Sequence, residues 1–209
     1  MSDSRRPPPE VNPDQSPTVR ALAHAETDEE LILGSRAYCR EAAREYDLDV
    51  DFSPVEWEVS TRAKRRAAAV KRPKISDAEV GDPVDWRAAA ERLDESLADL
   101  RTCTLSLTWA AFESFDVSQW TAVLRHELVH VEQFQRYGTT DHGRAFEARA
   151  ETVDATVRCP PFADPEYILT CADCGALVGR RYRECKLVRR HDRYRSSCCG
   201  ASLTCSEPE

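Results

Sequence analysis

The chain of 209 residues contains 29 Lys or Arg against 37 Asp or Glu, which gives a formal net charge of −8. This length can bury the core of one medium domain, or of one domain with a small appendage. The acidic balance excludes polyanion binding over the whole surface and leaves that role to a local basic patch. No run of about 18 apolar residues occurs, and the N-terminus lacks the apolar segment of a signal peptide. We therefore expect a cytoplasmic protein without membrane contact.

Residues 1–26 are rich in proline, because five of the chain's twelve prolines fall within the first 17 residues. Such a segment cannot bury enough apolar surface to offset the entropy lost on ordering. We predict that residues 1–26 form a disordered tail and that a folded domain follows over residues 27–160.

The first part of this domain shows one helical pattern and two strand patterns. The segment "TDEELILGSRAYCREAAREYDL" has apolar residues at helical spacing, with Thr27 or Asp28 as the N-cap. The segments "VEWEVS" (55–60) and "CTLSLTW" (103–109) alternate apolar and polar residues, as half-buried strands do. Residues 85–100 have the composition of a helix, whereas the path of the chain from residue 60 to residue 100 is not determined by any pattern.

A longer helix is predicted over residues 118–137. Asp116 or Ser118 can cap its start, and Gly138 can end it in a left-handed conformation. His126 and His130 are four residues apart on this helix, so both imidazoles lie on one face, about one turn apart. Two imidazoles at this spacing can chelate a single metal ion.

The segment His126-Glu127-Leu128-Val129-His130 has the form H-E-x-x-H, which is typical of zinc hydrolases. Zinc accepts neutral imidazole nitrogens and lowers the pKa of a bound water to about 7. Glu127 lies beside the first histidine and can take the proton of that water without being a ligand. The pattern predicts peptide hydrolysis, with Glu127 as the general base.

The third ligand distinguishes the classes of zinc peptidase. The metzincin pattern H-E-x-x-H-x-x-G-x-x-H is excluded, because Gln133 and Arg136 stand where it requires Gly and His. A carboxylate from a following helix is one alternative, with Glu147 or Glu151 in that role. His142 is favoured, since the loop after the helix can fold this imidazole back to the metal.

The segment "LRHELVHVEQFQRYGTTDHGRAFEA" resembles the active-site segment of the SprT-like metallopeptidases, which combine H-E-x-x-H with a later H-G-x-x-[WF]. His142, Gly143 and Phe146 match that second motif. The two predicted strands resemble the small sheet that precedes the catalytic helix in this family. Together with the cysteine-rich C-terminal segment, the resemblance covers about residues 28 to 205.

The resemblance implies a small zincin-like α+β domain with helices and a short antiparallel sheet. It implies that one catalytic Zn²⁺ is held by His126, His130 and His142, and that Glu127 is catalytic. It also suggests proteolysis linked to DNA, because eukaryotic members of the family cleave proteins that are crosslinked to DNA.

Six of the nine cysteines fall between Cys171 and Cys205, which in a cytoplasmic chain indicates metal ligation rather than disulfides. Cys171 and Cys174 form a C-x-x-C knuckle, and a second pair facing it would complete a structural zinc ribbon over residues 165–205. Many SprT-like proteins carry such a ribbon, with a second C-x-x-C-G. Here Ser196 replaces the first cysteine of that pair while Cys199 keeps the second, so we predict Cys198 as the substitute. The alternatives are a metal-free ribbon or the ligands Cys185, His191 and Cys205.

Two local clusters are basic in this acidic chain. Residues 62–74 contain seven basic and no acidic residues, and residues 180–195 contain eight basic residues against Glu184 and Asp192. Each cluster can be a solvated surface, and the two together favour contact with DNA.

Two functional hypotheses follow. The first is a zinc-dependent endopeptidase of the SprT-like type with a protein substrate, which the resemblance extends to proteins that are associated with or crosslinked to DNA. The second is a non-catalytic, zinc-containing adaptor that binds nucleic acid. A purely structural metal site does not need Glu127, which favours the endopeptidase. The sequence determines neither the peptide specificity nor the oligomeric state.

Overall fold

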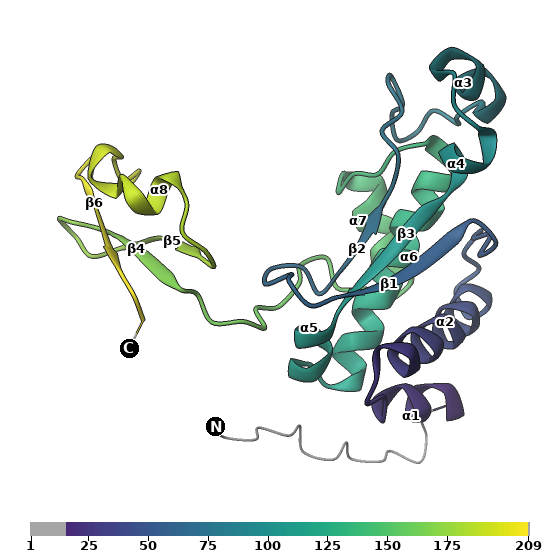
Figure 1. The fold of residues 1–209 in the computed structure, drawn as a ribbon, viewed down its shortest axis with the longest axis horizontal. Coiled ribbons are helices and arrows are strands. Elements are labelled where there is room, and N and C mark those ends of the chain that lie inside the picture. Colours follow the sequence, from purple (N-terminus) through teal and green to yellow (C-terminus); the bar gives the residue numbers. More distant parts are fainter. Residues whose placement is uncertain (1–15, 209) are drawn as a thin grey trace. The chain divides into compact units, whose positions relative to one another are not determined.

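The structure is a computed structural model, and it describes residues 16–208. The described residues form two compact units, which divide between Phe162 and Ala163. Both units combine helices with a small β-sheet, as the predicted α+β class requires (Figure 1). The predicted tail over residues 1–26 lies partly outside the described residues.

The first unit contains seven helices and three strands within the described residues. In chain order they are α1 (Pro17–Ala23), α2 (Asp28–Glu45), β1 (Val55–Ser60), β2 (Ala68–Lys71), α3 (Trp86–Leu93), α4 (Leu97–Arg101), β3 (Cys103–Thr108), α5 (Trp109–Ser114), α6 (Val117–Tyr137) and α7 (Arg144–Thr152).

The sheet of the first unit has the strand order β1-β3-β2. Strand β1 is parallel to β3, and β2 is antiparallel to β3. The prediction of a short antiparallel sheet is therefore wrong for this unit, whose sheet is mixed. The physical reason is the long connection over residues 61–102, because a crossover of a dozen or more residues lets two strands run in the same direction.

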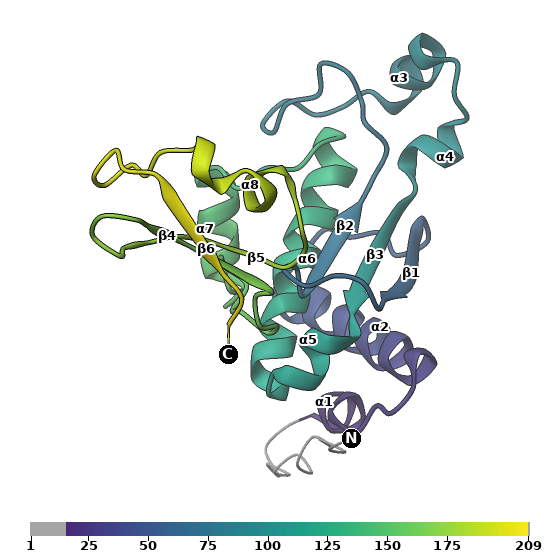
Figure 2. The ribbon, with the colours of Figure 1, turned by 60° about the vertical axis from the view of Figure 1, so that its left-hand side comes forward.

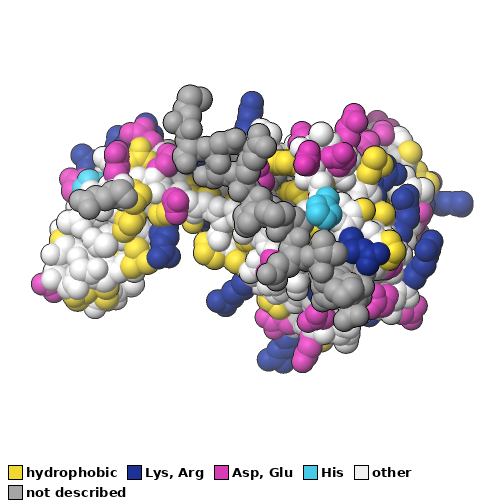
Figure 3. Space-filling model, turned by 90° about the horizontal axis from the view of Figure 1, so that it is seen from below, with side chains coloured by type: hydrophobic (Ala, Val, Ile, Leu, Met, Phe, Trp, Pro, Cys, Tyr) yellow, Lys and Arg dark blue, Asp and Glu magenta, His cyan; other side chains and the backbone are white. Residues whose placement is uncertain are grey.

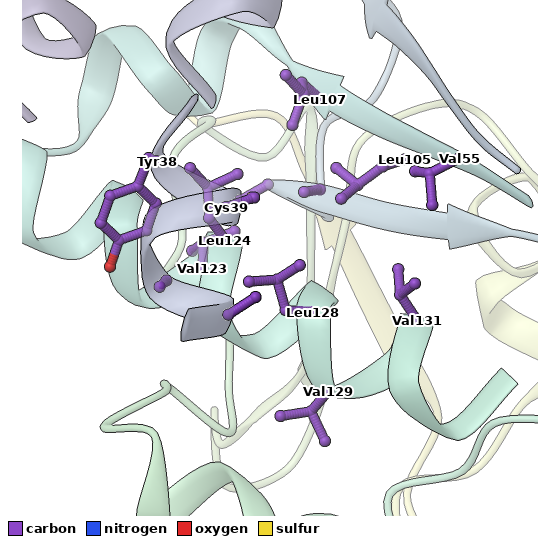
Figure 4. Packing of buried hydrophobic residues seen from close by; sticks show 14 of the residues in the cluster. Tyr38, Cys39, Val55, Leu105, Leu107, Val123, Leu124, Leu128, Val129 and Val131 are labelled. Carbon is purple, nitrogen blue, oxygen red and sulfur yellow. The ribbon is translucent and has the colours of Figure 1, made fainter. Parts of the chain in front are cut away.

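One face of this sheet packs against α2 and α6, which lie side by side (Figures 1 and 2). Leu105 and Leu107 of β3 are fully buried at this interface, as are Leu124 and Leu128 of α6. Figure 4 shows these side chains between the sheet and the helices. On the opposite face, Ser106 donates a hydrogen bond to Glu58, so that face is polar. The sheet thus holds α6 by one apolar face.

The predicted helices α2 and α6 are confirmed, and both begin with a capping box. Thr27 caps α2 and exchanges hydrogen bonds with Glu30, whereas Asp116 caps α6 and does the same with Gln119. Gly138 ends α6 with a φ of 70°, the left-handed conformation that glycine adopts without steric cost.

Two expectations need correction, and one strand was missed. The predicted disordered tail extends too far, because Pro17–Ala23 forms α1 and its Leu22 is fully buried. The helical segment near residues 85–100 is two helices, since Asp94 takes a left-handed conformation between them. Strand β2 was not predicted, because it lies within the basic cluster 62–74 and is too short to show an alternating pattern.

The second unit is a small antiparallel sheet with the strand order β5-β4-β6. Its elements are β4 (Tyr167–Cys171), β5 (Leu177–Arg181), α8 (Lys186–Arg189), the 3-10 helix η1 (His191–Arg193) and β6 (Leu203–Ser206). Few apolar side chains are buried in it, namely Leu169, Cys171, Val188 and Leu203. Such a small core is typical of domains that a metal ion stabilises.

Basic and acidic side chains are interspersed over the uncovered part of the first unit that Figure 3 shows. This face therefore carries no large patch of one charge. Over residues 16–208, every helix is too short or too polar to cross a membrane.

Candidate metal centres

His126, His130 and His142 form the first candidate metal site. His126 and His130 are one turn apart on α6, and His142 lies in the loop between Gly138 and α7. The Nε2 atom of His142 is 3.1 Å from Nε2 of His130 and 3.2 Å from Nε2 of His126. The structure thus brings the three predicted histidines together, with one nitrogen of each facing a common point.

The spacing of these nitrogens fits a zinc ion. With zinc–nitrogen distances of about 2.0–2.1 Å, two ligands of a tetrahedral site lie about 3.3 Å apart. The observed separations are close to this value. Three protein ligands leave one position of the tetrahedron for water or substrate, which distinguishes a catalytic site from a closed structural one.

The other ring nitrogens fix the tautomers. Nδ1 of His126 donates to the carbonyl oxygen of Thr156 at 2.6 Å, and Nδ1 of His130 lies 3.3 Å from Oε1 of Gln133. With their protons on Nδ1, both rings present bare lone pairs from Nε2 toward the common point. Converging lone pairs repel one another unless a cation lies between them, so this arrangement favours a bound metal.

Burial keeps these imidazoles neutral. It lowers the pKa of His130 to about 3, with a further contribution from His126 and His142, and it also lowers the pKa of His126. Neutral imidazole is the form that binds a metal, so these two ligands need not lose a proton at neutral pH.

Phe146 of α7 lies against all three imidazoles. Its ring centroid is 4.4 Å from that of His130, 4.7 Å from that of His142 and 4.8 Å from that of His126. Since Phe146 is fully buried, it forms a rigid apolar support for the three rings. Glu147 and Glu151, the alternative third ligands, are exposed and do not belong to this group.

Two buried polar residues, Gln133 and Arg125, support the histidine site through hydrogen bonds. Oε1 of Gln133 also accepts the Asp141 N–H at 3.3 Å, so Gln133 connects His130 to the loop that carries His142. The guanidinium of Arg125 donates to the carbonyl oxygen of Asp154, with Nε at 3.1 Å, and to the hydroxyl of Tyr38 at 2.5 Å.

Arg125 thereby fixes the segment that contacts His126. Its side chain is only 9% exposed, and its interaction with Asp154 lies two residues before Thr156, whose carbonyl accepts from His126. We conclude that Arg125 positions the Thr156 carbonyl and, through it, the imidazole of His126. Sequence reasoning missed this role, because a backbone carbonyl has no signature in the sequence.

Glu127 is buried, 5% exposed, and lines a cavity of 350 Å³ together with the three histidines. Burial raises the pKa of its carboxyl to about 8, although the Val70 N–H of β2 donates a hydrogen bond to it. Its Oε2 has no hydrogen-bond partner among the described residues. A buried carboxylate oxygen without a partner is costly, so it indicates a role for Glu127 in chemistry rather than in stability.

The second candidate site consists of Cys171, Cys174, Cys198 and Cys199, whose sulfur atoms lie within 4.8 Å of one another. The sulfur atoms of Cys174 and Cys198 are 3.5 Å apart, near the roughly 3.8 Å of a tetrahedral zinc site with bonds of about 2.3 Å. The structure thus groups the four predicted cysteines.

Ser196 explains how the altered second pair is accommodated. Its hydroxyl is 3.2 Å from the sulfur of Cys171, and the residue is buried beside the four cysteines. The backbone N–H of Cys174 and this hydroxyl lower the pKa of Cys171 to about 6, so a thiolate is available at neutral pH. The alternative ligands Cys185, His191 and Cys205 lie outside this group.

The chain matches no family model, no curated protein and no solved structure.

Metal content tests both sites. We expect two zinc ions per purified chain, and one after either His142→Ala or Cys174→Ser, because each substitution removes a ligand from only one site. Mass spectrometry under native conditions would count the ions. His191→Ala is the control and should retain two ions, since His191 belongs to neither group. Two ions that survive His142→Ala would contradict the histidine site.

The role of Arg125 can be tested by metal affinity. In a Cys174→Ser background, Arg125→Met should weaken zinc binding by about 10- to 100-fold, as the loss of groups that orient metal ligands commonly does. Competition with a chelator would measure this. Tyr38→Phe removes another partner of Arg125 but keeps the contact with Asp154, so its zinc affinity should stay within twofold. Equal affinities in all three proteins would exclude the positioning role.

Proposed function

We propose that this protein is a zinc-dependent endopeptidase of the SprT-like type. The observation that carries the proposal is the cavity in which three converging imidazoles lie beside the buried carboxyl of Glu127. Three nitrogen ligands with an adjacent carboxylate form the donor set of hydrolytic zinc enzymes.

A Zn²⁺ ion held by His126, His130 and His142 would polarise a substrate carbonyl and lower the pKa of a water molecule. Glu127 is suited to move protons in the same cavity. The raised pKa of Glu127 lies close to neutral pH, where a group that acts as both general base and general acid is most effective. The positive charge of a nearby metal ion would favour the ionised form of Glu127. We propose that Glu127 takes a proton from water and returns it to the leaving amine.

Strand β2 supports a peptide as the substrate. Within the described residues it pairs only with β3, so its other edge carries no further strand, although the Val70 N–H donates to Glu127. Its residues Ala68–Val70 line the cavity beside Glu127. An open edge strand can bind an extended peptide through backbone hydrogen bonds. A peptide bound along β2 would pass the triad with its scissile bond near Glu127.

The two candidate metal sites differ in their number of protein ligands, as expected for one catalytic and one structural site. The histidine site has three ligands on a cavity, whereas the cysteine site has four sulfur ligands and is closed. We therefore propose that the histidine site is catalytic and that the cysteine site stabilises the second unit as a zinc ribbon.

The ribbon is the favoured site for a DNA contact. Lys186, Arg189 and Arg190 are exposed and line a hollow of 440 Å³ by themselves. The cluster 62–74 is less suited, because Lys71 pairs with Glu58 and the partly buried Arg72 donates to Thr139. In the ribbon, Arg189 has only an exposed pair with Glu184 at 3.8 Å. We propose that the ribbon brings the peptidase to proteins associated with or crosslinked to DNA. The alternative is a non-catalytic adaptor that binds nucleic acid in the same way.

The substitution Glu127→Gln tests catalysis directly. It keeps all three histidines and the shape of the side chain but removes the base, so cleavage should fall by at least about 100-fold while two zinc ions remain bound. A protein crosslinked to an oligonucleotide would serve as the substrate. Glu132→Gln on the same helix is the matched control, because Glu132 pairs with Arg149 away from the cavity. Equal cleavage by Glu127→Gln and wild type would rule out the proposed mechanism.

Salt-dependent binding tests the ribbon. Replacing Lys186, Arg189 and Arg190 with Gln should reduce the slope of log affinity against log salt concentration by about 2 to 3 for duplex DNA, because each lost phosphate contact contributes about 0.9. The control replaces three exposed arginines of the first unit with Gln: Arg44, Arg87 and Arg144. An equal loss of slope in both triple variants would show that only net charge matters.

A further inference from the structure

Arg65 and Arg66 lie at the wall of the cavity that contains Glu127. Glu127 is the single acidic residue among those that line this cavity. Two arginines against one acidic residue give this lining an excess of basic residues, even though the chain as a whole is acidic. The charge of Arg66 also acts on Glu127 and lowers the pKa of its carboxyl, against the larger effect of burial.

The backbone at Arg66 is fixed in place. Its carbonyl oxygen accepts a hydrogen bond of 2.7 Å from the Thr108 hydroxyl, and the next carbonyl, of Ala67, accepts the Thr108 N–H at 2.9 Å. The segment that begins at Arg66 is thus hydrogen-bonded to β3, and it continues as β2. The position of its Cα atom beside the cavity is set by the sheet rather than by a free loop.

The two side chains are available to a ligand. Both residues are exposed, and neither makes an ion pair with another residue between 16 and 208. Other basic residues of the cluster 62–74 are engaged, as the pairing of Lys71 with Glu58 shows. Two exposed cations without an ion pair among the described residues attract an anionic group, and a bound Zn²⁺ would add to the same field.

The position of the two arginines shortly before β2 limits where that anionic group lies. Val70 donates to Glu127, and Arg66 precedes Val70 by four residues, which is about 13 Å of extended strand. A peptide bound along the open edge of β2 therefore passes Arg65 and Arg66 within about four residues of the bond beside Glu127.

We propose that Arg65 and Arg66 form a subsite that selects Asp or Glu side chains within about four residues of the scissile bond. This inference rests on the proposed endopeptidase function and deepens it by assigning acidic peptides as the favoured substrates. A nucleic-acid duplex is a poorer ligand for these arginines, because its major groove alone is about 12 Å wide and the duplex cannot enter a cavity of 350 Å³.

The test measures peptide binding without cleavage, in the full zinc-loaded chain that carries Glu127→Gln. The fluorescent peptides share one parent sequence. Each peptide carries a single Glu, Gln or Lys at one of the four positions on either side of the centre. Fluorescence anisotropy gives the affinity of each peptide. The Glu peptide should bind about tenfold more tightly than the Gln peptide at one or two positions. Arg65→Gln with Arg66→Gln should remove this preference, and Arg65→Glu with Arg66→Glu should shift it to the Lys peptide.

The matched control reverses two other charges of the same cluster. Arg62→Glu with Lys74→Glu changes the net charge by the same amount, and both residues are exposed and do not line the cavity. The control should keep the preference for the Glu peptide. A preference that the control loses equally would mean that only the overall charge acts, and this would overturn the subsite. Zinc content and circular dichroism confirm that each variant is folded, with the Arg→Gln pair as the milder change.

Further outcomes separate the subsite from the proposed function. Cleavage of Glu and Gln peptides at equal rates by the wild-type protein would overturn the subsite and leave the endopeptidase intact. Selective binding of the Glu peptide without cleavage by the wild-type protein would support the subsite and contradict the endopeptidase. If the Arg→Glu pair weakens binding of a single-stranded oligonucleotide but leaves peptide selectivity unchanged, the arginines serve nucleic acid and the subsite proposal fails.

Discussion

The burial of ionisable side chains on the single helix α6 is the constraint on which the rest of the first unit depends. Leu124 and Leu128 fix one side of this helix to the sheet, while Arg125, Glu127 and His130 are buried beside them. Buried polar groups are costly unless they find partners, so the surrounding chain must supply those partners. Arg125 and His130 have them, whereas one oxygen of Glu127 has none among the described residues. The unsatisfied group lies where the chemistry would occur.

The partners come from parts of the chain that are distant in sequence. The loop after Gly138 contributes His142, the segment near Thr156 orients His126, and strand β2 donates to Glu127 through Val70. The triad is thus assembled by tertiary structure, although two of its three members are fixed by helical spacing alone. Because His142, Thr156 and Val70 also line the cavity, the contacts that satisfy α6 also shape this cavity.

Helices and strands with strong local signals could be predicted from the sequence. Features that depend on tertiary contacts could not. The helix around His126 and its left-handed end at Gly138 follow from caps and periodicity, and the structure has both. The position of β2 could not be predicted, because four residues between arginines show no period. The roles of Arg125 and the Thr156 carbonyl were also hidden, since they depend on a loop that comes close only in the folded protein. In the second unit, Cys198 and Cys199 lie with Cys171 and Cys174 as their spacing predicted, whereas no spacing rule reveals the contact of the buried Ser196 with Cys171.

Three imidazoles that hold a metal ion with its fourth position open to water or substrate are what the proposed chemistry requires. Zinc-edge X-ray absorption on the Cys174→Ser variant would reveal this coordination, because the histidine site is then the intact one. We expect three imidazole nitrogens and one further oxygen ligand, which an added hydroxamate or other chelating carbonyl analogue replaces. A fourth protein ligand, such as sulfur from the nearby Cys159, with no spectral change on adding the analogue, would show a closed structural site and contradict this expectation.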